Sequence, residues 1–141
     1  MGARRLASPL GGRLALVADG NSHTAELYAR GLRSEGVGVL VAESCRLAVA
    51  LVDAHAFDLL VIDHDLPGGG ALQVLARLGV GGRHAHSRSI VCGSDWTAPD
   101  RWMALLCGAS VVLHKPVRSA DLLDRARSLL PYKPRIGIAL G

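Results

Sequence analysis

Short runs of apolar residues alternate along this chain with longer segments in which apolar residues recur every three or four positions. The short runs predict five buried strands, at 14–18, 37–42, 58–63, 89–92 and 110–113. The periodic segments predict helices at 22–35, 44–55, 70–79, 97–108 and 119–130. Because each strand is followed by a helix, we expect an α/β fold. It would be a doubly wound, five-stranded parallel sheet, or (βα)5, with helices on both faces.

The predicted helices carry start signals and an apolar face each. Ser44 is placed to cap the second helix, and Thr97 with Asp100 has the spacing of a capping box. The faces expected to pack on the sheet are Leu27, Tyr28, Gly31 and Leu32 in the first helix, Leu47, Ala48, Leu51 and Val52 in the second, and Leu122, Leu123, Ala126, Leu129 and Leu130 in the last.

Length and charge indicate one domain with basic flanks. The chain has 141 residues, and we expect a flexible basic tail at 1–12, a domain at 13–130 and a C-terminal tail or linker root at 131–141. Net charge is +4, but 11 basic and 12 acidic residues remain between 14 and 130 once the flanking Arg4, Arg5, Arg13, Lys133 and Arg135 are set aside. This distribution argues against nucleic-acid binding by the domain itself, which would need a clustered basic surface.

Cysteine usage and hydropathy favour a cytoplasmic protein. Cys45, Cys92 and Cys107 show no CxxC spacing, so we expect small buried residues in a reducing compartment. No apolar run approaches the roughly 20 residues of a membrane span, and the first residues lack the apolar segment of a signal peptide. We therefore expect no membrane contact.

Charged residues follow three of the predicted strands. Asp63 ends the third strand, Asp19 follows the first, and Lys115-Pro116 follows the fifth. The carboxyl ends of parallel strands meet at one edge of a sheet, where ligands bind in open α/β folds. We therefore expect an acid and a lysine to face each other across one crevice.

Three motifs at these strand ends resemble those of the response-regulator receiver domain, which has the CheY-like, flavodoxin-type fold. They are Ala18-Asp19-Gly20-Asn21, then Asp63 with Leu66-Pro67-Gly68, then Gly108-Ala109-Ser110 with Lys115-Pro116. The resemblance covers about residues 13–130. It implies a receiver in two-component phosphorelay signal transduction, a signalling module rather than an enzyme.

The resemblance also implies roles for single residues. Asp63 would accept a phosphoryl group from a histidine kinase or a phosphotransfer protein. Mg²⁺ would be held by Asp19, Asp63 and Asp65, the last through its backbone carbonyl, and would offset charge on the transferring oxygens. Lys115 would pair with the acyl phosphate, and the Lys115–Pro116 bond is expected to be cis. Phosphorylation would remodel the face formed by the fourth helix, the fifth strand and the fifth helix.

Three positions depart from the family pattern. Gly20 stands where a second acid normally binds the metal, Gly93 where a Ser or Thr contacts the phosphoryl group, and Val112 where strand five carries an aromatic residue. A shift of one residue would supply the hydroxyl of Ser94, and the Asp65 carboxylate could add charge to the site. We expect weakened rather than abolished Mg²⁺ binding.

The chain's two tryptophans, Trp96 and Trp102, lie around the fourth helix. Each is expected either to anchor the core or to contact a homodimer or output partner on the face described above. His64 and His114 neighbour site residues but are given no role, because strand alternation should turn them away.

Two other functions stay open at this point. A phosphorylation-independent pseudo-receiver, acting as a dimerisation or protein-binding module, is favoured by Gly20, Gly93 and Val112. An Asp-nucleophile phosphatase of the haloacid dehalogenase type is suggested by Asp63-x-Asp65. Its nucleophile motif, however, belongs on the first strand, and the chain has no room for a cap.

Overall fold

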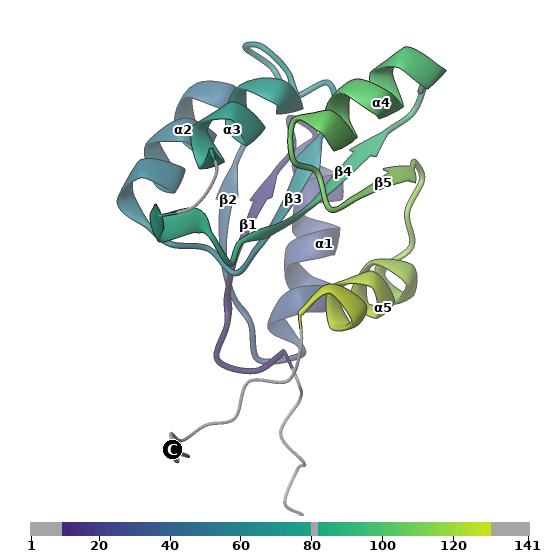
Figure 1. The fold of residues 1–141 in the computed structure, drawn as a ribbon. Coiled ribbons are helices and arrows are strands. Elements are labelled where there is room, and N and C mark those ends of the chain that lie inside the picture. The colour runs from purple at the N-terminus through teal and green to yellow at the C-terminus, as the bar shows by residue number, and fades with distance from the viewer. Residues whose placement is uncertain (1–9, 80–81, 131–141) are drawn as a thin grey trace, which may run out of the picture.

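Every strand of the computed structural model, which describes residues 10–79 and 82–130, lies in one parallel sheet ordered β2-β1-β3-β4-β5 (Figure 1). This is the flavodoxin-type order expected from the resemblance. The elements are β1 (Leu14–Ala18), α1 (Ser22–Arg33), β2 (Gly38–Ala42), α2 (Cys45–Ala54), β3 (Leu59–Asp63), α3 (Ala71–Leu78), the short 3₁₀ turn η1 (Gly82–His84), β4 (Arg88–Gly93), α4 (Ala98–Leu106), β5 (Val111–His114) and α5 (Ser119–Leu129).

Successive strand residues serve two cores, one on each face of the sheet. Side chains of β1, β3 and β4 that point to one face pack against α1 and α5, and those that point to the other pack against α2, α3 and α4. Figure 1 shows these helices covering the two faces. Burial on both faces explains why the strands are near-continuous apolar runs.

The predicted strands are confirmed to within one residue at each end, and the helices to within two. The start signals are confirmed as well. The Ser44 side chain accepts a hydrogen bond from the Leu47 backbone, and Thr97 and Asp100 form a reciprocal capping box. Asn21 caps α1 by accepting from the Thr24 backbone, a cap that the sequence analysis did not assign.

Three burial predictions are wrong. Leu27 is 44% exposed and Leu47 is 41% exposed, because each precedes the buried position of its helix by one residue and is rotated about 100° from it. Cys107 is exposed because it is the C-cap residue of α4, beyond the last helical turn. Cys45 and Cys92 are buried, as expected.

The described residues extend the packed domain slightly toward the N-terminus. Leu10 is fully buried in the α1/α5 core, and the Gly12 backbone donates to the Gly36 carbonyl. The remainder of the expected N-terminal tail, and the expected C-terminal segment 131–141, lie outside the described residues.

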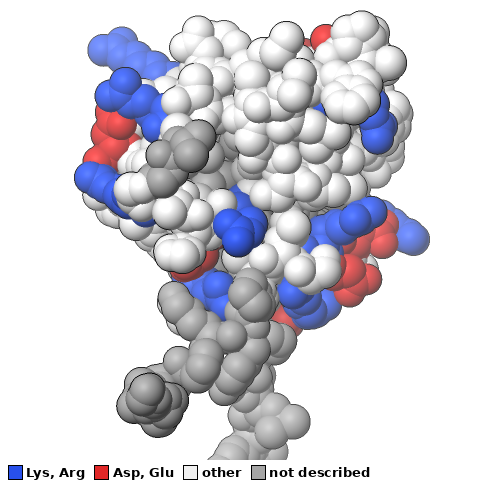
Figure 2. Space-filling model, in the orientation of Figure 1, with Lys and Arg blue, Asp and Glu red and all other residues white. Residues whose placement is uncertain are grey.

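Basic and acidic side chains are interspersed over the surface rather than segregated. Figure 2 shows them intermixed over α5 and along the left edge of the same face, while the upper middle of this face is mostly uncharged. Specific pairs include Arg77 with Asp53 and Arg127 with Glu35. Within the described residues, no helix is long and apolar enough to cross a membrane.

Candidate functional site

The carboxyl edge of the sheet brings together Asp19, Asp63 and Lys115. Asp19 directly follows β1 and is held by a backbone hydrogen bond to Ala42 of β2, while Asp63 is the last residue of β3. Lys115 directly follows β5, and its backbone N–H donates to the Gly93 carbonyl at the end of β4. The predicted encounter of the acids with the lysine is therefore present in the structure.

The Lys115 ammonium lies between the two carboxylates. Its Nζ is 3.0 Å from Asp19 Oδ2 and 3.3 Å from Asp63 Oδ1. Partial burial lowers the pKa of Lys115, but the hydrogen bond and charge of Asp19, together with the charge of Asp63, outweigh burial and raise it above its ordinary value. The site therefore holds a permanent cation near neutral pH. The Lys115–Pro116 peptide bond is cis, as the resemblance implies.

The two carboxylates differ in their surroundings. Asp19 is 2% exposed, and its second oxygen, Oδ1, accepts from the Asn21 backbone at 2.9 Å. The Asp63 side chain is 12% exposed, and its Oδ1 also accepts from the Asp65 backbone at 3.1 Å. Asp19 is thus a fixed partner of Lys115, whereas Asp63 is the carboxylate that an incoming group can reach.

Asp65 and Ser94 lie at the margin of this cluster. The Asp65 side chain is exposed on the loop after β3, and no cluster of three His, Cys, Asp or Glu side chains is placed to hold a metal ion anywhere in residues 10–79 or 82–130. Ser94 is exposed and lines a cleft of about 310 Å³ together with Lys115, Tyr28 and Thr24. The exposed Leu27 side chain lines the same cleft.

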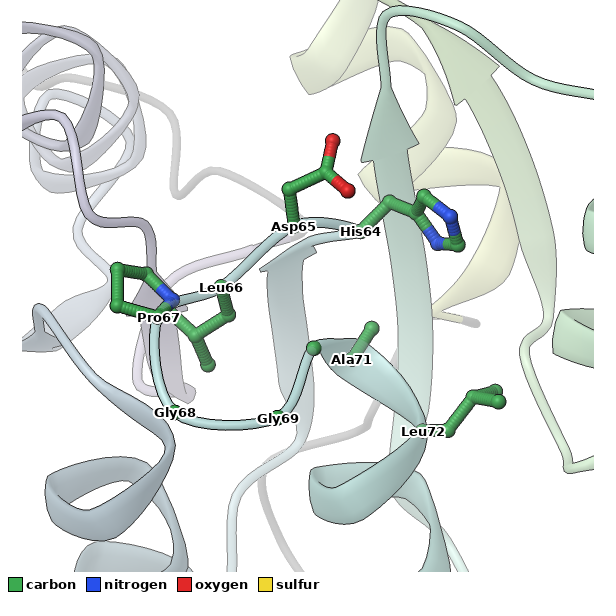
Figure 3. Close-up of a pocket in the computed structure, with 9 residues that line it drawn as sticks. His64, Asp65, Leu66, Pro67, Gly68, Gly69, Ala71 and Leu72 are labelled. Carbon is green, nitrogen blue, oxygen red and sulfur yellow. The ribbon is translucent and has the colours of Figure 1, made fainter.

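A second, larger hollow of about 500 Å³ is formed by residues 64–72, the loop after Asp63 and the start of α3. Figure 3 shows His64 extending toward β4 and Pro67 on the opposite side of the loop, with Asp65 directed outward between them. Asp19, Asp63 and Lys115 do not line this hollow. It is therefore a neighbour of the charged cluster rather than its cavity.

Gly20 is packed against the loop that follows the acceptor. A Cβ atom built on Gly20 would lie 2.7 Å from both Cδ and Cγ of Pro67, which is closer than real Cβ atoms come. The ring of Pro67 thus occupies the space that the side chain of a second acid would need.

Gly93 is packed in a comparable way, and its neighbour is Trp96. A Cβ on Gly93 would lie 2.8 Å from Trp96 Cε2 and 3.0 Å from His64 Cβ. The Trp96 ring stacks on His64 with 4.3 Å between centroids, and its Nε1 donates to the Leu113 carbonyl at 2.9 Å. Trp96 is therefore partly buried and anchored, whereas Trp102 is 65% exposed on α4.

The sequence analysis missed the contact of His64 with Trp96 and a pair of residues beneath the carboxylates. The pair is Tyr28 of α1 and Cys92 of β4, which are both buried. Burial raises the pKa of the Cys92 thiol to about 12, although the Lys115 ammonium opposes the shift. The signal for this pair is that Cys92 of β4 pairs with Asp63 of β3 in the sheet, which places the thiol close to the acceptor carboxylate.

Comparisons with known proteins agree with one another. A family model described as the response regulator receiver domain matches residues 15–127. The regulatory protein VanR of Enterococcus faecium is 27% identical over 124 residues, which are 87% of this chain and 52% of VanR. The transcriptional regulatory protein TcrA of Mycobacterium tuberculosis is 34% identical over 119 residues, 84% of this chain and 46% of TcrA. The chain thus spans about half the length of these curated relatives.

Solved structures show the same fold. The chemotaxis response regulator CheY4 of Vibrio cholerae superposes with a TM-score of 0.77 at 18% identity, covering 84% of this chain and 98% of that one. A response regulator of Burkholderia pseudomallei superposes with a TM-score of 0.73 at 25% identity, covering 84% and 66%. The latter structure contains a phosphorylated aspartic acid, a calcium ion and citrate.

Proposed function

The chain belongs to the response regulator receiver domain family, and from this premise we propose that Asp63 accepts a phosphoryl group from a histidine kinase or a phosphotransfer protein. Receiver domains of this family serve two-component signalling and are generally not enzymes. The observation that carries the assignment is the Lys115 ammonium held 3.3 Å from Asp63 and 3.0 Å from Asp19. Asp63 is the more accessible of these two carboxylates.

The proposed transfer is a substitution at phosphorus. An Asp63 carboxylate oxygen attacks the phosphorus of a phosphohistidine, the P–N bond breaks, and the electron pair leaves with the imidazole of the donor. The product is an acyl phosphate on Asp63. Lys115 is placed to pair with its added negative charge, and Asp19 keeps the ammonium positioned throughout.

The oxygen donors at this site are of the kind that bind a divalent cation such as Mg²⁺. Carboxylate and carbonyl oxygens are the ligands that Mg²⁺ prefers, and one or two carboxylates with waters and phosphate oxygens suffice. Asp19 and Asp63 would hold it, with Asp65 contributing its backbone carbonyl and the charge of its exposed side chain. Bound there, the ion would neutralise charge on the phosphoryl oxygens. Because Gly20 supplies no carboxylate, we propose weaker Mg²⁺ binding than in receivers with two acids.

Ser94 is the proposed hydroxyl contact to the phosphoryl group. It shares the 310 Å³ cleft with Lys115, whereas Gly93 has no side chain and no room for one. The family match does not favour the pseudo-receiver or the phosphatase described above.

The proposed partner surface is the outer face of α4. Trp102, Met103, Leu105 and Leu106 are 65%, 48%, 44% and 74% exposed, an unusual number of large apolar side chains for one short helix. In the receiver role this face would contact an output partner or a second copy of the chain. All three cysteines are free, which is consistent with the reducing cytoplasm proposed for the protein.

The test of the proposal is the intact mass of the protein after incubation with acetyl phosphate, with and without Mg²⁺. Wild type is compared with Asp63→Asn and with the matched control Asp124→Asn, which alters an exposed acid on α5 away from the site. We expect one phosphoryl group on wild type and on the control, and none on Asp63→Asn. A beryllofluoride-binding measurement on the same samples detects a site whose adduct decays too fast for mass analysis.

A further inference from the structure

The departures at Gly93 and Val112 remove both residues through which the family resemblance implies that the acceptor is coupled to the rest of the domain. In this chain the space beside Gly93 is filled by Trp96, which comes from the loop between β4 and α4. A Cβ on Gly93 would lie 2.8 Å from that ring, so glycine at 93 and tryptophan at 96 depend on each other. The absence of a hydroxyl at 93 is thus accompanied by a new aromatic contact.

Trp96 touches the loop after Asp63 on one side. Its ring lies 4.3 Å from that of His64, at an interplanar angle of 39°. His64 directly follows Asp63, and its backbone donates to the Cys92 carbonyl at 2.7 Å. A shift of the main chain at Asp63 therefore reaches the Trp96 ring through a single residue.

Trp96 touches β5 on the other side. Its Nε1 donates to the Leu113 carbonyl at 2.9 Å, two residues before Lys115. The acceptor strand and the strand that carries the lysine are thus joined through one side chain, although β4 lies between them in the sheet. The indole forms this connection through its ring contact with His64 and its single N–H donor.

The same residue leads directly into α4. Trp96 precedes Thr97, the N-cap of that helix, and Asp100 of the capping box has its Oδ2 at 3.9 Å from His64 Nε2. Ala104 is the one residue of α4 that is buried. The helix that presents the exposed apolar face thus meets His64 and Trp96 at its N-terminal end and packs on the core through Ala104.

We infer that Trp96 couples the state of Asp63 to β5 and α4, in place of a hydroxyl residue at 93 and an aromatic residue at 112. This inference rests on the proposed phosphoryl-acceptor function. When a phosphoryl group forms on Asp63, the adjacent His64 adjusts, the Trp96 ring moves with it, and the N-terminal end of α4 follows. The exposed face that includes Trp102 changes position as a result.

Tryptophan fluorescence tests the coupling, because the chain has only two tryptophans. In the Trp102→Phe variant, Trp96 is the sole emitter. Beryllofluoride is added with Mg²⁺, and its binding is followed independently by ¹⁹F NMR. We expect the Trp96 emission to change in intensity or wavelength in step with the bound fluorine signal, and to stay constant in Asp63→Ala/Trp102→Phe.

The reciprocal variant examines transmission to α4. In Trp96→Phe, Trp102 is the sole emitter, and we expect beryllofluoride still to bind while the Trp102 emission stays constant. Bound beryllofluoride with unchanged Trp96 emission would overturn the coupling and leave the proposed function intact. So would a Trp102 response that survives in Trp96→Phe. Failure of beryllofluoride and of acetyl phosphate to occupy the wild-type site would overturn the proposed function and the coupling together.

Discussion

Replacing Gly93 with alanine should destabilise the domain much more while Trp96 is present than after its ring is removed. The added Cβ would lie 2.8 Å and 3.0 Å from two carbons of the Trp96 ring and 3.0 Å from His64 Cβ. The ring is restrained by its hydrogen bond to Leu113, so it cannot withdraw freely. Overpacking of this kind costs about 1–3 kcal/mol of unfolding free energy.

Removing the ring removes most of this cost. In a Trp96→Ala background both ring contacts are gone and only His64 Cβ at 3.0 Å remains, so the cost of that contact is set against the gain of about 0.5–1 kcal/mol from replacing a strand glycine, and the net effect should be close to zero. The four proteins of this double-mutant cycle should therefore show a coupling of about 2 kcal/mol between positions 93 and 96.

Urea unfolding at constant pH measures the cycle. With a slope of about 1–3 kcal/mol/M, the coupling corresponds to a difference of about 1 M between the midpoint shifts that Gly93→Ala causes in the two backgrounds. Equal midpoint shifts in both backgrounds would refute the packing of the Trp96 ring against Gly93, because they would mean that Trp96 does not fill the space beside that residue.

Three further outcomes follow from the site. Gly20→Asp should lower the unfolding free energy by about 1–3 kcal/mol, since its Cβ meets the Pro67 ring at 2.7 Å. The double variant Gly20→Asp/Pro67→Ala should recover this stability and, by calorimetry, bind Mg²⁺ more tightly than wild type. A double variant that stays as unstable as Gly20→Asp would contradict the contact between Gly20 and Pro67. The pKa of Lys115 is raised, so its contribution to stability is complete below pH 10.5 and is lost as the pH rises through the folded-state value. Lys115→Met should flatten the alkaline decline of unfolding free energy measured by urea titration, and an unchanged decline would argue against the ion pairs. Alkylation of the folded protein at pH 8, followed by peptide mapping, should label the exposed Cys107. It should spare Cys92, which is buried and has a pKa of about 12, until urea is added. Labelling of Cys92 before urea is added would mean that the end of β4 is open to solvent.

The sequence predicted the charged cluster because strand ends determine it. Asp63 and Lys115 follow buried apolar runs, and a parallel sheet necessarily brings such positions to one edge. Placing these two residues at the sheet edge required no knowledge of side-chain packing. Gly20 and Gly93 were identified as departures by the resemblance to the receiver family and not by the strand ends.

What replaces the missing side chains was beyond the sequence analysis, because it depends on contacts between loops. Pro67 reaches Gly20 from the loop after β3, and Trp96 folds back over Gly93 from the loop after β4. Periodicity gives no information on the direction in which a loop side chain turns. The exposure of Leu27 was missed as well, and its side chain lines the cleft beside Lys115 where the helix pattern predicted core.

The most direct test of the central claim identifies the residue that carries the phosphoryl group. The protein is incubated with acetyl phosphate and Mg²⁺, the acyl phosphate is trapped by reduction with borohydride, and the modified residue is located by peptide mass spectrometry. We predict homoserine at position 63 alone. Homoserine at position 19 or 65, or modification at 63 that is equally strong without a phosphodonor, would contradict the assignment of Asp63 as the acceptor.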